Sequence, residues 1–299
     1  MVGLKPEEVW NAQAPRWPPS GGDLSRHLAD KATFPLEDTR DRSDLPKVSS
    51  YYVDNLNRRW LKQTLRSVLA GPYQFGEVHK VLASQRAIRL YVVTNYDTLL
   101  EQAFEAIGRP YDLVVYPADR RDLGNGLLWW PAGAKEPVTK EANQLDIEKF
   151  GDSDSKTTVI FKMHGSIARS SSGYDNFVIT EEDYVEFLSR MTTNSAIPPV
   201  FLDYARDCSF LFLGYSLGDW NFRVLLRNLG KHLTQKAASH ADGKAVTQPV
   251  PQAPEEEEVP SWAIQLHPSE LERILWIKRN VRIFDLSVEE FAEKIKKWL

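Results

Sequence analysis

The chain has 299 residues, a net charge of −4 and an isoelectric point near 5.9. Its 42% hydrophobic and 26% charged residues are typical of a globular protein and exclude a disordered chain. The acidic balance gives no overall electrostatic case for direct nucleic-acid binding. The single cysteine, Cys208, excludes an internal disulfide and a four-cysteine zinc site. No apolar stretch approaches the ~20 residues of a membrane span, and the first residues lack a hydrophobic signal region. We therefore expect a cytoplasmic protein without membrane contact.

The first 86 residues divide into two segments with different sequence patterns. Residues 1–21 contain proline and tryptophan without a period, so we expect an extended lead-in. Residues 22–86 have a helical pattern, in which DNLNRRWLKQTLRSVLAGP places apolar residues at helical spacing and stops at Gly71-Pro72. This part predicts a small helical subdomain.

From residue 87 onward, short apolar runs alternate with helical segments. The runs are AIRLYVV, DLVVY, TTVIFKM, SFLFL, SWAIQL and VRIF. Such alternation favours a parallel sheet covered on both faces, so residues 87–299 predict a Rossmann-like α/β domain. Two segments are expected to be loops: the polar stretch 117–157, a surface insertion, and 235–260, which combines proline with a glutamate run.

The helix starts of this domain carry capping residues. Asp97, Thr180 and Asp219 each precede a helical segment, and Ser287 with Glu290 has the spacing of a capping box.

Polar residues follow three of the predicted strands. The strands run into Thr94-Asn95-Tyr96-Asp97, His164-Gly165-Ser166 and the segment 214–219, GYSLGD. In open parallel sheets, ligands bind beyond the carboxyl ends of the strands. The sequence therefore predicts that an amide, an acid, an imidazole and a hydroxyl meet at one edge of the sheet.

Each of these residues also has a structural interpretation. Asp97 can be only a helix cap, and Asn95 can merely close a turn. His164 can be a hydrogen-bonded structural residue. Gly165 after it allows either backbone or a ligand to approach closely, which favours a functional role for this histidine.

The segment from Gly214 to Gly218 also fits the G-x-S-x-G nucleophile elbow of serine hydrolases. The acid and histidine of such a triad would be Asp242 and His267, which places the acid in the predicted loop. The pattern is short and common by chance, so we disfavour this alternative.

Taken together and in order, these segments resemble the SIR2-like, sirtuin-related NAD-binding superfamily. TNYD (94–97), KMHGS (162–166) and FLGYSLGDWNFR (212–223) resemble its strand-end, catalytic-histidine and ribose-binding motifs. GYSL-x-D-x-N and VITEEDY (178–184) resemble in particular the bacterial SIR2-like NAD hydrolases of antiphage defence. The resemblance covers roughly residues 13–299.

The resemblance implies a role for each residue. Asn95 would orient the nicotinamide ribose and the attacking water, His164 would be the general base, and Asp97 would support the nicotinamide and ribose geometry. The remaining implied NAD contacts are Thr94, Gly165, Gly214, Ser216, Leu217 and Asn221, of which Gly214, Ser216 and Asn221 would hold the adenosine half.

Two departures from the family qualify these expectations. Protein-deacylating sirtuins usually carry a four-cysteine zinc module, which one cysteine cannot build. NAD would thus be a substrate, hydrolysed to nicotinamide and ADP-ribose without zinc. The family's first strand and Gly-Ala-Gly phosphate loop are also missing before residue 95, and PPSGGDLSRHLA (18–29) resembles the helix that follows that loop. Either the native start lies upstream or part of the site has been lost.

Three hypotheses follow from the resemblance. The first is an NAD hydrolase of antiphage defence that works as a homo-oligomer or in a hetero-complex with a defence partner. The second is a module that binds NAD or ADP-ribose, or forms a complex, without turnover. The third is an NAD-dependent protein deacylase.

Overall fold

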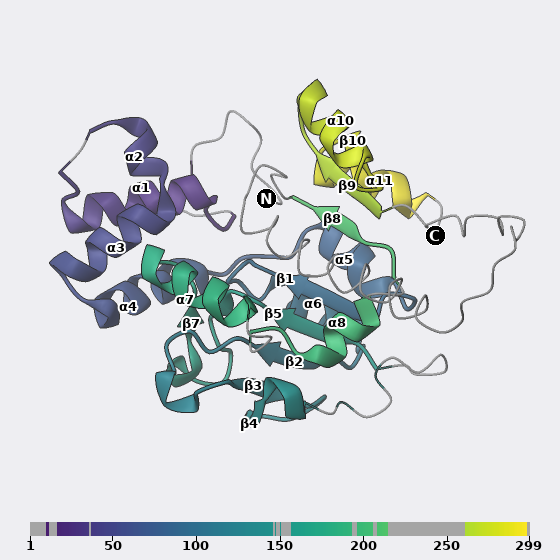
Figure 1. Cartoon of the computed structure of the whole chain (residues 1–299), viewed down its shortest axis with the longest axis horizontal. Coiled ribbons are helices and arrows are strands. Elements are labelled where there is room, and N and C mark those ends of the chain that lie inside the picture. Colours follow the sequence, from purple (N-terminus) through teal and green to yellow (C-terminus); the bar gives the residue numbers. More distant parts are fainter. Residues whose placement is uncertain are drawn as a thin grey trace, which may run out of the picture. The chain divides into compact units, whose positions relative to one another are not determined.

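A computed structural model provides the fold. It describes residues 10–11, 17–35, 37–145, 147, 150, 157–192, 196–205, 208–214 and 261–297. The chain divides into two compact units, one made of Met1–Val200 with Ile295–Leu299 and the other of Phe201–Lys294. Figure 1 shows the elements of both units along the chain.

Four helices open the first unit: α1 (Gly21–Ala32), α2 (Thr39–Ser43), α3 (Leu45–Asn55) and α4 (Arg58–Leu69). They gather together in Figure 1, which agrees with the helical pattern of the sequence. A capping box of Ser20 and Asp23 starts α1, and the Asn57 side chain accepts the Trp60 amide at the start of α4. The buried faces of α1, α3 and α4 form one cluster, which also includes Tyr96, Ile167, Phe177 and Ile179.

The first unit also holds a five-stranded sheet with the order β1-β5-β2-β3-β4. Strands β1 (Leu90–Val93), β5 (Val159–Lys162) and β2 (Asp112–Val115) are parallel, as their apolar sequences predict. Helices α5 (Glu77–Ser84) and α6 (Leu99–Ala106) pack on one face of it. The core between them contains Ala83, Tyr91, Leu100, Phe104 and Ile160.

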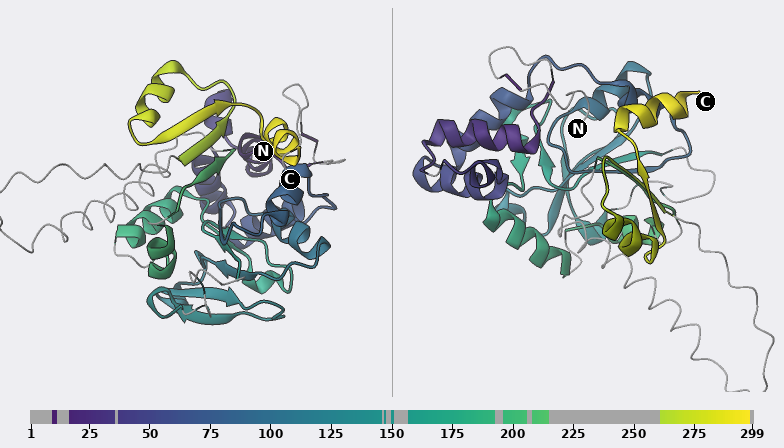
Figure 2. Two further views of the ribbon diagram at one scale, coloured as in Figure 1. Left: turned by 90° about the vertical axis from the view of Figure 1, so that its right-hand side faces the viewer. Right: turned by 90° about the horizontal axis from the view of Figure 1, so that it is seen from above.

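The prediction that residues 117–157 form an irregular insertion is wrong for part of that segment. Strands β3 (Gly126–Trp130) and β4 (Val138–Glu141) form an antiparallel hairpin that extends the sheet from β2 (Figure 2, left). Short 3-10 turns lie on either side of it, at Arg121–Leu123 and Ala142–Gln144. Trp129 Nε1 donates to Asp112 Oδ2 at 2.9 Å, which joins β3 to the start of β2. The sheet is therefore mixed rather than purely parallel.

A small ribbon and a helix follow β5. Strand β6 (Gly165–Ser166) pairs antiparallel with β7 (Asn176–Phe177), and the 3-10 turn Ser172–Tyr174 lies between them. Helix α7 (Glu181–Thr192) then begins at the predicted cap. The Thr180 Oγ1 accepts the Asp183 amide at 3.2 Å, and the Asp183 carboxylate accepts the Thr180 amide at 2.9 Å.

The second unit has its own three-stranded parallel sheet, with the order β10-β9-β8. Its strands are β8 (Leu211–Leu213), β9 (Ser261–Gln265) and β10 (Val281–Asp285), and helix α10 (Glu270–Ile277) packs beside β10. Two helices cross the boundary between the units, α8 (Pro199–Ala205) and α11 (Val288–Lys296). The predicted Ser287–Glu290 capping box at α11 is confirmed.

Some expectations lie outside the described residues, namely the Asp219 cap and the loop 235–260. Cys208 is half-buried. Among the described helices, none combines the length and the apolar character that crossing a membrane requires.

Candidate functional site

Strands β1 and β5 bring two of the predicted motifs to the same edge of the sheet. The two strands run parallel and in register, with Val93 paired to Lys162 at their carboxyl ends. Beyond this point, the Ser166 hydroxyl and the Ile167 amide both donate to the Tyr96 carbonyl, at 3.1 and 2.9 Å. The turn after β1 and the loop after β5 are therefore held together by hydrogen bonds to one carbonyl.

The turn after β1 presents a polar surface. Asn95 is exposed there, while Thr94 and Asp97 are half-buried. Asp97 Oδ1 accepts the amide of Leu99, the first residue of α6, at 3.0 Å, but the N-cap position itself is Thr98, one residue later than predicted. The Tyr96 side chain points the other way: its buried hydroxyl donates to the Val178 carbonyl at 2.7 Å. The exposed side chain of Asn95 therefore lies between strand β1 and Tyr96, whose buried side chain fixes the turn.

His164 lies at the end of β5 in an apolar environment. Its side chain is 8% exposed, and its ring meets the rings of Tyr184 and Phe187 edge-on, at 5.5 and 5.3 Å between centroids. Burial lowers the pKa of His164 to about 4, because no nearby charge offsets the loss of water around the imidazolium. The imidazole is therefore neutral at physiological pH. Its Nε2 atom is buried and has no hydrogen-bond partner among the described residues.

Gly165 has a structural reason to be glycine. Its φ is +83°, and a Cβ atom there would lie 2.1 Å from the Asn176 carbonyl oxygen. Of the two possibilities that the sequence left open, backbone and ligand, the structure places backbone of β7 against this position.

A buried ion pair supports the turn, and the sequence reading missed it. Lys162 and Glu101 are each 1% exposed, and Lys162 Nζ lies 3.4 Å from Glu101 Oε1. The same ammonium group donates to the Asp97 carbonyl. Burial raises the pKa of Glu101, and the positive charge of Lys162 opposes that rise. The available signal was a charged residue inside each of two apolar segments, TTVIFKM and LLEQAF.

Arg58 ties helix α4 to the ribbon and to α7. Its guanidinium donates to Asp119 Oδ1 at 2.6 Å, to Asp183 Oδ2 at 2.7 Å and to the Phe177 carbonyl at 2.6 Å. Asp119 Oδ2 also accepts the Phe177 amide at 3.2 Å. The sequence offered no local signal for this clamp, because its partners are more than 60 residues apart from Arg58 along the chain.

The third predicted motif lies in the second unit. Gly214 ends β8 with φ +69° and is exposed. Ser216, Leu217 and Asn221 lie outside the described residues. Within the described part of the chain, no group of three histidine, cysteine, aspartate or glutamate side chains could hold a metal ion.

Comparison with known proteins agrees with this arrangement. Three curated relatives are each called NAD(+) hydrolase ThsA. The protein from Cytobacillus dafuensis is 23% identical over 217 residues, which cover 73% of this chain and 36% of the relative. Those from Acinetobacter baumannii and Bacillus cereus are 27% and 25% identical, over 68% and 63% of this chain and 35% and 32% of the relatives. The chain thus spans about a third of the length of these relatives.

The family comparison covers more than half of the chain. The description "SIR2-like domain" matches residues 89–283, which include the turn after β1, the loop after β5 and the end of β8. The chain therefore belongs to the SIR2-like domain family.

Proposed function

We propose that this chain hydrolyses NAD at the bond between nicotinamide and ribose, releasing nicotinamide and ADP-ribose. The observation that carries the proposal is His164, a neutral, buried imidazole whose Nε2 atom has no hydrogen-bond partner among the described residues; it follows β5, next in the sheet to the strand that leads to Asn95. Membership of the SIR2-like family supports NAD as the ligand.

This reaction needs little general-acid catalysis from the protein. The bond from ribose C1′ to the nicotinamide nitrogen breaks, its electron pair stays on the ring nitrogen, and nicotinamide leaves as a neutral molecule. A water molecule forms the new bond to C1′ and gives up one proton. The protein must hold the ribose, place the water and accept that proton.

Asn95 and His164 have the properties that these tasks need. The exposed Asn95 amide can both donate to and accept from a ribose hydroxyl and a water molecule. The neutral His164 can accept a proton at Nε2, although its lowered pKa makes it a weaker base than an ordinary histidine. Because its imidazolium form is disfavoured by burial, the proton would return to solvent readily after each turnover.

The other site residues are proposed to position NAD. Thr94, Asp97 and Gly165 would lie along the nicotinamide ribose, where Lys162 stabilises the Asp97 backbone. Gly214, Ser216, Leu217 and Asn221 would hold the adenosine half. As with the antiphage-defence proteins that the motifs resemble, we propose that turnover is controlled by self-assembly or by a defence partner.

The experiment is to measure nicotinamide release from NAD by chromatography, for the wild type and single variants. Asn95→Ala and His164→Gln should each lower the rate by at least about 100-fold. Asn125→Ala is the matched control, since Asn125 is also an exposed turn asparagine but precedes β3. Wild-type rates in both site variants, with their folds intact by circular dichroism, would contradict the proposal.

One observation favours a second function, NAD binding without turnover. The proposed base is 8% exposed, so a substrate water could be denied access to it. In that case calorimetry would detect NAD binding that Asn95→Ala weakens, and no nicotinamide would appear over several hours.

A further inference from the structure

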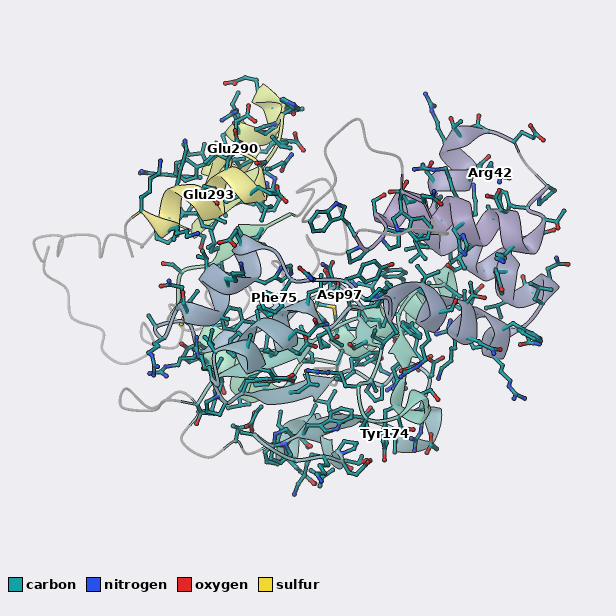
Figure 3. The ribbon with its side chains drawn as sticks, turned by 180° about the vertical axis from the view of Figure 1, so that it is seen from behind. Arg42, Phe75, Asp97, Tyr174, Glu290 and Glu293 are labelled. Atoms are coloured by element: carbon teal, nitrogen blue, oxygen red, sulfur yellow. The ribbon has the colours of Figure 1, made fainter. Side chains whose placement is uncertain are left out.

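The first unit contains a cavity of about 510 Å³ on the face of the sheet that α6 covers. It is bounded by α6 and the turn that follows it, by β2 and β3, and by the loop of residues 166–174. Figure 3 shows Tyr174, one of its lining residues, well away from Asp97. A cavity of this size is in the range that holds a small organic ligand.

The cavity adjoins the proposed NAD-cleaving residues, because Thr98 and Ser166 line it, but it does not include them. Asn95, Asp97 and His164 do not line it. The His164 ring packs against Tyr184 and Phe187 of α7, whereas the cavity lies along α6. A ligand here would therefore be additional to the nicotinamide end of NAD.

Three aromatic residues contribute to the cavity wall. Trp130 from β3, Tyr111 before β2 and Tyr174 from the loop all line it. Trp130 and Tyr174 meet edge-on, with 5.7 Å between ring centroids. Walls of this kind suit a flat aromatic ligand, because ring faces and edges attract one another.

Glu101 supplies a buried polar group to the same cavity. Its side chain is 1% exposed, it lines the cavity, and neither carboxyl oxygen has a hydrogen-bond partner among the described residues. Lys162 Nζ lies 3.4 Å from Glu101 Oε1 and donates to the Asp97 carbonyl. A buried acceptor left in this state is costly, so a ligand that carries N–H donors would satisfy it.

Positive side chains lie at the exposed part of the lining. Lys135 is exposed, and Arg169 is 49% exposed and pairs with Glu105. Arg109 is already engaged, because its guanidinium donates to the carbonyls of Ala83 and Gln85, at 2.8 Å each. Lys135 therefore remains to meet an anion, while Arg169 would share its guanidinium between Glu105 and that anion.

From this combination we propose that the cavity binds a purine nucleoside monophosphate. The purine ring would lie among Trp130, Tyr111 and Tyr174, with N–H groups of its edge donating to Glu101. The phosphate would lie near Arg169 and Lys135. This site is independent of the NAD-hydrolysis proposal, since it shares none of the three catalytic candidates.

Calorimetric titration of the whole chain tests the site. The probes are AMP and GMP, their nucleosides, and inorganic phosphate. One of the two nucleotides should bind, its nucleoside at least about tenfold more weakly, and phosphate alone not at all. Arg169→Ala and Lys135→Ala should each weaken the nucleotide about tenfold and leave the nucleoside unchanged. Lys140→Ala is the matched control, an exposed lysine of β4 outside the cavity.

Further variants assign the bound nucleotide to this cavity. Glu101→Gln and Trp130→Leu should weaken nucleotide and nucleoside alike. Asn95→Ala and Asn221→Ala, at the proposed NAD contacts, should leave binding intact. The proposal is overturned if neither nucleotide binds, if binding survives both Glu101→Gln and Arg169→Ala, or if Asn221→Ala abolishes it. Because Lys135 and Arg169 are on the surface, their variants remain informative even if a buried substitution unfolds the chain.

Discussion

The buried imidazole of His164 makes a quantitative prediction about acid stability. Burial lowers its pKa from an ordinary value of 6.5 to about 4. Between these two values the unfolded chain binds a proton at His164 and the folded chain does not. Stability from this group is therefore fully present above pH 6.5 and is lost as the pH falls toward 4.

The size of the effect follows from the two pKa values. They differ by about 2.5, and each unit corresponds to about 1.4 kcal/mol, so the complete loss is about 3–4 kcal/mol. At pH 4.5 most of that loss, about 2–3 kcal/mol, should already be present. The side chain is only 8% exposed, so screening by solvent should reduce this value little.

The assay compares urea unfolding at pH 7 and pH 4.5 for the wild type and for His164→Gln. The variant cannot titrate at this position, while every other ionisable group stays in place. The free energy of unfolding should therefore fall by about 2–3 kcal/mol less in the variant than in the wild type over this pH interval. Subtracting the change in unfolding free energy of the variant from that of the wild type removes the contribution of the carboxylates, which titrate in both proteins.

Two results would refute this reasoning. One is an identical pH dependence in both proteins. The other is an NMR titration in which the His164 ring takes up its proton near pH 6.5 in the folded chain, which would show that the imidazole is hydrated.

Three other predictions concern the supports of the site. Gly165→Ala should lower the free energy of unfolding by more than about 3 kcal/mol or prevent folding, because the new Cβ would lie 2.1 Å from a carbonyl oxygen. The control Gly173→Ala, whose Cβ would meet only a side chain at 3.5 Å, should change the melting temperature little. Lys162→Met should lower the free energy of unfolding by about 3–5 kcal/mol, because it leaves Glu101 buried without its ion pair, and adding Glu101→Gln should restore part of that loss. A double variant whose loss of stability equals the sum of the two single losses would contradict the coupling. Arg58→Lys should cost about 2 kcal/mol, since an ammonium cannot reproduce the fork that bonds Asp119, Asp183 and a carbonyl; an unchanged urea midpoint would count against the clamp.

Local sequence was sufficient for several of the elements and for the polar residues that follow β1 and β5. The apolar runs at residues 90–93, 159–162 and 281–285 form the strands that they predict, and the caps at Thr180 and Ser287 are present. These features depend on residues a few positions apart, so a single stretch of sequence contains them.

The β3–β4 hairpin shows where local reading fails. Strand β3 is apolar and buried, but its partner β4 is VTKE and exposed along its length. A polar edge strand has no hydrophobic period of its own, and it exists here because β3 supplies its hydrogen bonds. Residues 138–141 extend the sheet because they pair with β3, and not because of their own sequence.

The candidate site divides in the same way. The sequence alone determined that Asn95, Asp97 and His164 follow parallel strands, because strand ends and helix caps are set by neighbouring residues. Tertiary structure decided that His164 is buried beside α7 and neutral, that Gly165 faces the Asn176 backbone, and that Lys162 is paired with Glu101. Burial and ion pairing depend on groups that the fold brings together from distant parts of the chain, and no local pattern of residues encodes them.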